Sequence, residues 1–146
     1  VPASELTKKV FGGFKKACHT EYKFDSEPEH LFALLCERDN AILKWLRPAP
    51  KQFKIWWRGG QSYEPDFVVE TKDKIFMIEI KASNRLKDEE VLLKAKAAYA
   101  FCDNINEVMP ENKTWIYMLL TEGEFNRSTT FDYLASEIKL YSYHKN

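Results

Sequence analysis

Residues 63–82 constrain the fold of this chain most, because charged side chains interrupt two runs that are typical of buried β-strands. Residues 66–71 and 75–81 are rich in Val, Ile and Phe, which favour strands. The Lys72-Asp73-Lys74 segment between them is long enough only for a tight turn. The sequence therefore predicts a β-hairpin centred near Asp73, with the beginning of the first strand beside the end of the second.

Three charged residues lie at the open end of this predicted hairpin. Asp66 begins the first strand, and Glu79 and Lys81 end the second. Side chains alternate along a strand, so Glu79 and Lys81 share one face while Ile80 points to the other. The hairpin places Asp66 beside Ile80 or Lys81. The sequence leaves the register open, since a slip of one residue would move Asp66 to the other face.

Two carboxylates and one ammonium group in a buried setting indicate a divalent metal site, because unpaired buried charges are costly. Mg²⁺ takes oxygen ligands and binds through one or two carboxylates, water and substrate phosphate. We expect Asp66 and Glu79 to be ligands, with the backbone carbonyl of Ile80 as a third oxygen and Mn²⁺ as a substitute metal. Lys81 would act on water or phosphate, so the predicted chemistry is phosphodiester hydrolysis. A structural salt bridge from Lys81 to either carboxylate is the alternative.

The Pro65-Asp66 pair, followed across a hairpin by Glu79-Ile80-Lys81, resembles the motif of the PD-(D/E)xK nuclease superfamily. The wider segments FDSEPEHLFA, WLRP, QFKIWW, SYEPDFVVET, MIEIKA and LLKAKAAYAFC resemble the C-terminal nuclease domain of type III restriction enzyme Res subunits and of related DEAD/DEAH-type helicase proteins. The resemblance covers residues 11–120, most of the chain.

The resemblance implies a restriction-endonuclease-like α/β fold and Mg²⁺-dependent cleavage of double-stranded DNA in the cytoplasm. It also implies a helicase or translocase domain in the same full-length chain and a modification (methyltransferase) subunit as partners. Two other functions stay open. One is a degenerate nuclease fold that serves as a DNA-binding or interaction module. The other is a Holliday-junction resolvase or repair exonuclease of the same superfamily.

Glu29 is a third acidic candidate. By the resemblance, it matches the helical Glu that precedes Phe32-Ala33 and reaches toward the metal or its water. The residues themselves also allow a capping box, in which Glu29 bonds back to the backbone N–H of Ser26. Both interpretations stay open, with Glu27 as the substitute if the helix begins elsewhere.

Basic residues near the predicted site are expected to contact the DNA backbone. By the resemblance, the helix after the hairpin carries a residue that faces the phosphate, and Lys96 is preferred there over Lys94. Loop residues at the site edge would position DNA without reading its sequence. These loop residues are Arg58, Asn84, Arg85 and Lys87. Trp45, Trp56 and Trp57 are expected to pack in the core, with stacking on bases as the alternative.

The predicted order of elements is helix, three strands, helix, strand, with an extra helix near each terminus, which is typical of an α/β fold whose mixed sheet is flanked by helices. The predicted helices cover residues 4–18 (broken at Gly12-Gly13), 27–38, 88–102 and 129–140. The predicted strands cover residues 52–57, 66–71, 75–81 and 114–121, the last of them central in the sheet. Residues 41–46 indicate a short helix or turn that stops at Pro48.

Composition is consistent with a single domain over residues 1–146, since 45% hydrophobic residues can form one substantial core. Val1 at the start suggests a domain excised from a longer polypeptide, and neither a membrane-spanning run nor a secretory signal is expected. Cys18, Cys36 and Cys102 lack the spacing of a zinc site and indicate reduced thiols.

The charge balance argues mildly against a stand-alone DNA binder. The chain has 22 Lys and Arg residues and 22 Asp and Glu residues, whereas tight non-specific DNA binding usually needs a basic excess. Tethering to a DNA-translocating motor would remove this need, because it supplies a high effective concentration.

Overall fold

The structure is a computed structural model that describes residues 11–12, 15–17, 21–22, 24, 26–48, 54–126 and 128–142. The helices are α2 (Glu27–Arg38), the short 3-10 helix η1 (Ser83–Arg85), α3 (Glu89–Val108) and α4 (Phe131–Ser142). The strands are β1 (Phe11–Gly12), β2 (Glu21–Tyr22), β3 (Ile42–Leu46), β4 (Ile55–Arg58), β5 (Gln61–Tyr63), β6 (Phe67–Thr71), β7 (Lys74–Lys81) and β8 (Thr114–Thr121).

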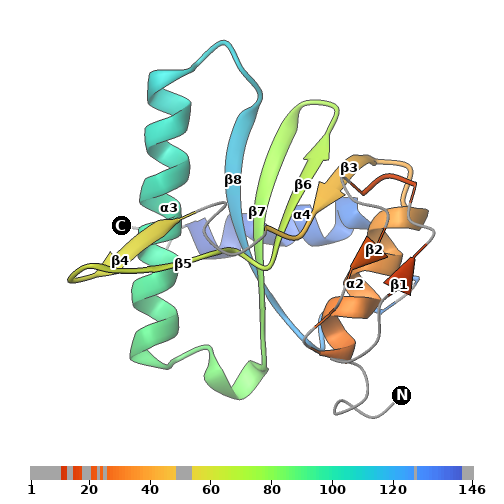
Figure 1. Ribbon diagram of the computed structural model, residues 1–146, viewed down its shortest axis with the longest axis horizontal. Helices are drawn as coiled ribbons and strands as arrows, with labels where there is room; N and C mark the ends of the chain where they lie inside the picture. The colour runs from red at the N-terminus through yellow and green to blue at the C-terminus, as the bar shows by residue number, and fades with distance from the viewer. Residues whose placement is uncertain are drawn as a thin grey trace.

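A four-stranded sheet with the order β3-β6-β7-β8 forms the centre of the structure (Figure 1). Strands β3, β6 and β7 are antiparallel, whereas β7 and β8 are parallel. Parallel neighbours require a crossover connection, which α3 supplies. The prediction of an α/β fold with a mixed sheet flanked by helices is confirmed. The β1-β2 and β4-β5 pairs form separate two-stranded sheets.

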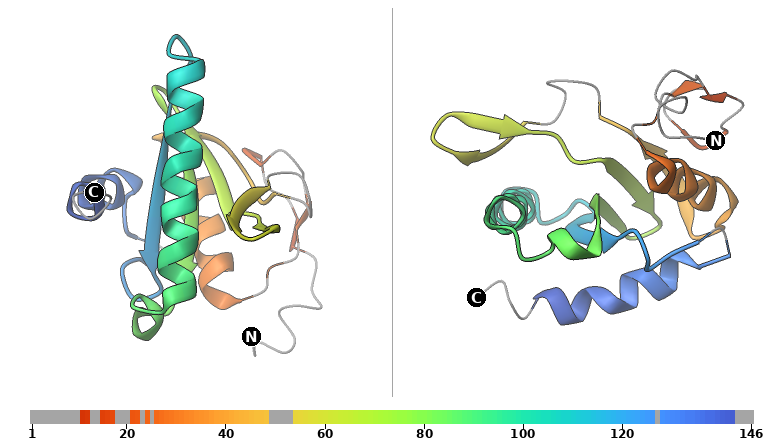
Figure 2. Two further views of the ribbon diagram at one scale, coloured as in Figure 1. Left: turned by 90° about the vertical axis from the view of Figure 1, so that its left-hand side faces the viewer. Right: turned by 90° about the horizontal axis from the view of Figure 1, so that it is seen from below.

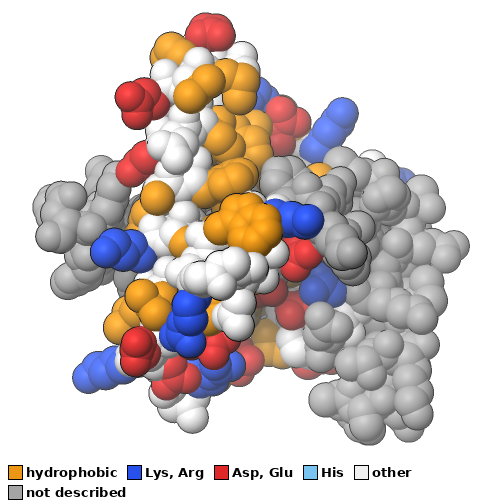
Figure 3. Space-filling model, turned by 60° about the vertical axis from the view of Figure 1, so that its left-hand side comes forward, with side chains coloured by type: hydrophobic (Ala, Val, Ile, Leu, Met, Phe, Trp, Pro, Cys, Tyr) orange, Lys and Arg blue, Asp and Glu red, His pale blue; other side chains and the backbone are white. Residues whose placement is uncertain are grey.

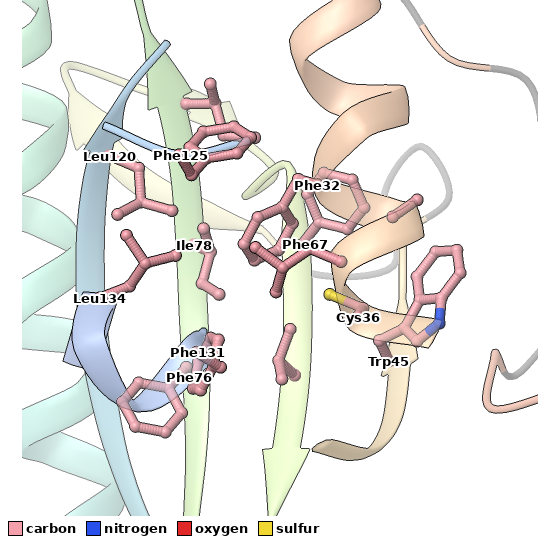
Figure 4. Close-up of a cluster of buried hydrophobic side chains, with 14 of the residues drawn as sticks. Phe32, Cys36, Trp45, Phe67, Phe76, Ile78, Leu120, Phe125, Phe131 and Leu134 are labelled. Carbon is pink, nitrogen blue, oxygen red and sulfur yellow. The ribbon is translucent and has the colours of Figure 1, made fainter. Parts of the chain in front are cut away.

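Helices cover both faces of this sheet (Figure 2). Helices α2 and α4 lie on one face, and the core between them and the sheet is rich in aromatic rings (Figure 4). Its members include Phe32, Cys36, Phe67, Phe76, Ile78, Leu120, Phe125, Phe131 and Leu134. The Phe32 ring packs edge-on against the rings of Phe67 and Phe125, with centroids 4.9 and 5.6 Å away.

Helix α3 covers the other face and forms a second core with it. Met77 and Tyr117 from the sheet pack with Ala98 of α3 and with Ile55 of strand β4. The predicted alternation along β7 is therefore confirmed, because Met77 lies in this second core while Phe76 lies in the first. Glu79 belongs to the same face as Met77 and so points to the α3 side of the sheet.

The segment predicted as a short helix or turn at residues 41–46 is strand β3, so that prediction is wrong. Its pairing with β6 shifts register between Ile42 and Lys44. This bulge brings Ile42 and Trp45 to the buried side although they are three residues apart, a spacing that resembles one helical turn. Trp45 is 1% exposed, which confirms its expected place in the core.

Two other sheet predictions need correction. The strand predicted at residues 52–57 is β4 over Ile55–Arg58, with residues 52–53 outside the described part, and it pairs with β5 instead of joining the main sheet. Strand β8, predicted to be central, is at the edge of the sheet. It is nevertheless buried at its C-terminal half, because α3 and α4 cover its two faces.

The predicted helix over residues 4–18 is also wrong where the structure describes it. Phe11–Gly12 forms strand β1, and Ala17 makes a β-bridge to Trp45. Residues 4–10, and Cys18 with them, lie outside the described residues.

Helix α3 extends to Val108, beyond the predicted end at Cys102. The Asn106 side chain donates to the carbonyl of Trp115 at 2.9 Å and accepts from its N–H at 2.7 Å. This pairing ties the last turns of α3 to strand β8.

Cys36 and Cys102 are buried free thiols, as predicted. Across the described ranges, no helix is both long and apolar enough to cross a membrane.

Asp39 joins two elements that are far apart in the sequence. Its Oδ1 accepts a hydrogen bond from the N–H of Ala41 at 2.9 Å, just before strand β3. Its Oδ2 accepts from the N–H of Phe131 at 2.7 Å, at the beginning of α4. A carboxylate at a helix N-terminus satisfies an orphan N–H and complements the helix dipole. Asp39 therefore holds α4 against the turn between α2 and β3.

We predict that Asp39→Ala lowers the free energy of unfolding by about 1–3 kcal/mol, since hydrogen bonds to a charged acceptor are lost and two N–H groups lose their partner. Urea denaturation measures the change. Asp73→Ala, in the exposed hairpin turn, is the control and should change stability by less than about 0.5 kcal/mol. Equal stabilities of Asp39→Ala and Asp73→Ala would show that Asp39 does not hold α4.

Candidate active site

Asp66 and Glu79 face each other across strands β6 and β7. Phe67 pairs with Ile78, so the same register one residue further places Asp66 opposite Glu79. Directly opposed residues point to the same face of a sheet, with Cβ atoms about 4.5–5.5 Å apart. The structure thus decides the register that the sequence left open. Asp66 lies opposite Glu79, whereas Ile80 or Lys81 was predicted at that position.

Pro65 ends the ladder between these strands. The register places Pro65 opposite Ile80, and proline has no N–H to donate to the Ile80 carbonyl. The Ile80 N–H donates to Oδ2 of Asp66 at 2.8 Å, and this bond orients the Asp66 carboxylate. Pro65 gives the Ile80 carbonyl no ladder donor.

The Glu79 carboxylate is buried without full compensation. Glu79 is only 3% exposed, and its Oε1 has no hydrogen-bond partner among the described residues. Burial and, after it, the charge of Asp66 raise the pKa of Glu79 from 4.5 to about 7, although Lys81 and Lys94 lower it. A buried polar atom left unpaired and a strongly shifted pKa are both typical of functional sites.

Tyr63, at the end of strand β5, closes the site on the α3 side. Its hydroxyl donates to the backbone carbonyl of Lys94 at 2.9 Å and also lies beside the Glu79 carboxylate, where it lowers the pKa of Glu79. Burial and the charge of Glu79 raise the pKa of Tyr63. Sequence reasoning missed this residue, because the three-residue strand β5 was not recognised.

Lys81 lies on the Glu79 face and is partly buried. Its charge lowers the pKa of Glu79. In the part of the chain that the structure describes, neither Glu79 nor Lys81 takes part in an ion pair within 4 Å. A structural salt bridge between them, the alternative to a metal site, is therefore not seen there.

Glu29 is connected to the site indirectly, by contacts of Arg47. Its carboxylate forms an ion pair with the Arg47 guanidinium at 2.5 Å, and Arg47 Nε donates to the backbone carbonyl of Asp66 at 3.5 Å. The guanidinium also lies 5.5 Å from the centroid of the Phe67 ring. Arg47 therefore links helix α2 to the beginning of β6. It was missed in the sequence, although it lies in the WLRP segment.

The predicted cap of helix α2 is partly seen. Ser26 Oγ accepts from the N–H of Glu29 at 3.3 Å, so Ser26 is the N-cap. Glu27, the substitute candidate, is exposed.

The carboxylates do not form a three-ligand metal cluster. Over the described ranges, no group of three or more His, Cys, Asp or Glu side chains is placed to hold a metal ion. Asp66 and Glu79 are the carboxylates that the sheet brings together, and the Glu79 oxygen without a donor fits a cation. A pair of carboxylates is a common donor set for Mg²⁺, whose remaining ligands are waters and substrate oxygens.

Of the predicted basic residues, Lys94 acts on the site, because its charge lowers the pKa of Glu79, and it forms an ion pair with Glu90 at 2.8 Å. Its ammonium lies 4.9 Å from the Trp57 ring centroid and 5.4 Å from that of Tyr63. Lys96, preferred from the sequence, is on the exposed side of α3. Arg58 and Arg85 are exposed as well. The Arg58 guanidinium lies over Trp57 at 4.7 Å, and Arg85 pairs with Asp88 at 3.0 Å.

Comparisons with models of protein families, with curated proteins and with solved structures find no match to this chain. The candidate site therefore rests on the geometry around Asp66 and Glu79.

We predict that metal-free wild-type protein loses stability as the pH rises from about 4.5 to 7, and that Glu79→Gln does not. The pKa of Glu79 in the folded state is raised, to about 7, so its contribution is complete below pH 4.5 and is lost as the pH rises to 7. The loss is on the order of 3 kcal/mol, at about 1.4 kcal/mol per pKa unit.

Urea denaturation in EDTA at several pH values measures this difference. Glu79→Gln should be the more stable protein at pH 8, and the gap should close near pH 4.5. Glu107→Gln, on the exposed surface of α3, is the control and should follow the wild-type profile. Parallel profiles for wild type and Glu79→Gln would contradict the burial of a costly charge.

Proposed function

We propose that this domain is a Mg²⁺-dependent endonuclease that hydrolyses phosphodiester bonds of double-stranded DNA. The observation that carries the proposal is the pair formed by Asp66 and Glu79, in which a buried Glu79 oxygen has no donor within the described residues. The ammonium of Lys81 on the same face adds the third charge of the motif. A bound cation would compensate both carboxylates, and it would explain why a sheet core contains them.

Asp66, Glu79 and the Ile80 carbonyl would hold the metal. When bound, Mg²⁺ would polarise phosphate oxygens and make a water molecule more acidic. Lys81 has no lone pair in its charged form and would instead stabilise negative charge on the phosphate or orient the attacking water. Lys94, whose charge acts on Glu79 although it also pairs with Glu90, would add positive charge for the substrate. Glu29 would act through Arg47, by positioning the backbone of Asp66.

The succession α2, β3, β6, β7, α3, β8 around a mixed sheet supports a restriction-endonuclease-like fold as part of this proposal. The sequence resemblance supports a role as the nuclease domain of a type III restriction subunit. Its partners would then be a helicase or translocase domain in the full-length chain and a modification subunit. A net charge of zero suits a domain that such a motor brings to DNA.

We predict that Asp66→Ala and Glu79→Ala each abolish Mg²⁺-dependent cleavage while the domain stays folded, because each removes a ligand oxygen. Cleavage of supercoiled plasmid in Mg²⁺ or Mn²⁺ measures activity, and circular dichroism checks folding. Asp73→Ala removes a carboxylate at the far end of the same hairpin and should cleave normally. Normal cleavage by Asp66→Ala or Glu79→Ala would refute the site. A wild-type domain that binds DNA but never cleaves it would favour the degenerate binding module.

We predict that Lys81→Met binds Mn²⁺ about as well as wild type but loses cleavage by about 10²-fold or more, the scale for positioned proton transfer and charge stabilisation. Calorimetry measures metal binding, and single-turnover cleavage measures the rate. Lys74→Met, at the exposed beginning of the same strand, is the control. If Lys81→Met lost metal binding together with activity, Lys81 would be a structural partner of Glu79. If it kept full activity, Lys81 would have no part in the reaction.

A further inference from the structure

The hairpin formed by β4 and β5 crosses α3, outside the main sheet (Figures 1 and 2). Its inner face is well packed. Ile55 pairs with Tyr63, and both point to α3, where Ile55 is buried in the second core and Tyr63 bonds to Lys94. The hairpin is therefore held by its inner face, and its other face is free to carry a different function.

Trp56 occupies this outer face. It is 61% exposed, which contradicts the expectation that it packs in the core. Its cross-strand neighbour is Ser62, a side chain too small to cover an indole ring. An exposed indole offers a large flat apolar surface, and covering it with a ligand would remove a large apolar area from water.

Positive charges surround the indole rings of this hairpin. The Lys54 ammonium lies 5.9 Å from the Trp56 ring centroid, and the Arg58 guanidinium lies 4.7 Å from that of Trp57. The Lys94 ammonium lies 4.9 Å from the Trp57 ring centroid and is paired with Glu90. Figure 3 shows hydrophobic and basic side chains next to each other on this face of the molecule. Aromatic rings among cations match the chemistry of nucleic acid, in which flat bases alternate with phosphates.

The hairpin is also directly connected to the candidate site. Strand β5 ends at Tyr63, and only Glu64 and Pro65 separate Tyr63 from Asp66. The Tyr63 hydroxyl lies beside Glu79. A strand of nucleic acid at the site would therefore continue past the hairpin.

We propose that the β4–β5 hairpin binds single-stranded or locally unpaired DNA next to the site, with Trp56 stacked on an unpaired base and Lys54 and Arg58 beside phosphates. This inference rests on the proposed nuclease function for its substrate, but its binding step is independent of cleavage. Bases in an intact duplex have both faces covered by their neighbours. An exposed indole therefore distinguishes unpaired from paired DNA, whereas phosphate contacts do not.

Binding of a fluorescein-labelled 20-nucleotide single strand is measured by anisotropy in EDTA, where metal-dependent cleavage cannot occur. Three ligands are compared at equal salt: this strand, its blunt duplex, and a strand of the same length with a central run of abasic sites. Wild type should bind the single strand more tightly than the duplex. Trp56→Ala should weaken binding of the single strand about tenfold, the scale of one base–aromatic stack. Trp56→Phe should keep most of the affinity.

The abasic strand separates stacking from charge. It retains the phosphates, so wild type should bind it about as weakly as Trp56→Ala binds the normal strand, and Trp56→Ala should not weaken it further. Tyr133→Ala, which removes an exposed aromatic ring from α4, is the control and should bind like wild type. Thermal unfolding checks that Trp56→Ala stays folded, as expected for an exposed residue.

Equal affinities of wild type and Trp56→Ala for the normal strand would overturn the inference, as would an equal loss on the abasic strand. These outcomes are distinct from failure of the proposed nuclease function. A Trp56-dependent preference for single strands in a protein that never cleaves with Mg²⁺ or Mn²⁺ would leave the hairpin as a DNA-binding element and refute the enzyme. If the protein cleaved DNA with Mg²⁺ or Mn²⁺ but showed no Trp56-dependent preference for single strands, the nuclease function would stand and the hairpin inference would be refuted.

Discussion

The hydrogen bond from the Ile80 N–H to the Asp66 carboxylate is the interaction on which the candidate site depends. A regular ladder would pair Ile80 with the backbone of residue 65, but proline has no N–H to donate to the Ile80 carbonyl. The Ile80 N–H itself donates to the side chain of Asp66. One backbone irregularity thus aims a carboxylate at the position opposite Glu79 and leaves the ladder open at the Ile80 carbonyl. Three oxygen sources are brought to the same end of β7.

This arrangement destabilises the ionised form of the Glu79 carboxylate. Burial opposes its charge, and Asp66 adds to this effect, so the pKa of Glu79 is raised to about 7. The surrounding positive charges of Lys81 and Lys94 lower the pKa but do not restore its usual value. A structural role would be served as well by an apolar residue at this position, because replacing buried ions by well-packed apolar groups is often neutral or stabilising. A ligand that compensates the charge accounts for the carboxylate better.

Long-range contacts hold the elements that surround the site. Arg47 joins Glu29 of α2 to the backbone of Asp66, and the Tyr63 hydroxyl joins the β4–β5 hairpin to α3. Each contact fixes an element on one side of the sheet relative to the carboxylates. The two cores supply the rigid support, since aromatic packing on one face and α3 on the other leave strand β7 buried for most of its length. The hairpin is the exception, because its outer face carries Trp56 into solvent.

Local patterns in the sequence were sufficient for strands β6, β7 and β8, for helices α2 and α4, and for the shared face of Glu79 and Lys81. Strand alternation and a short turn depend on neighbouring residues, so they can be deduced without the fold. Strand β3 could not be deduced, because its bulge imitates helical spacing and only pairing with β6 reveals it. The same holds for the opposition of Asp66 and Glu79, for the contacts of Arg47 and Tyr63, and for the position of Lys94 over the Tyr63 ring while Lys96 is exposed. Each depends on a register or a packing contact between distant segments, and such contacts form only when the tertiary structure brings those segments together.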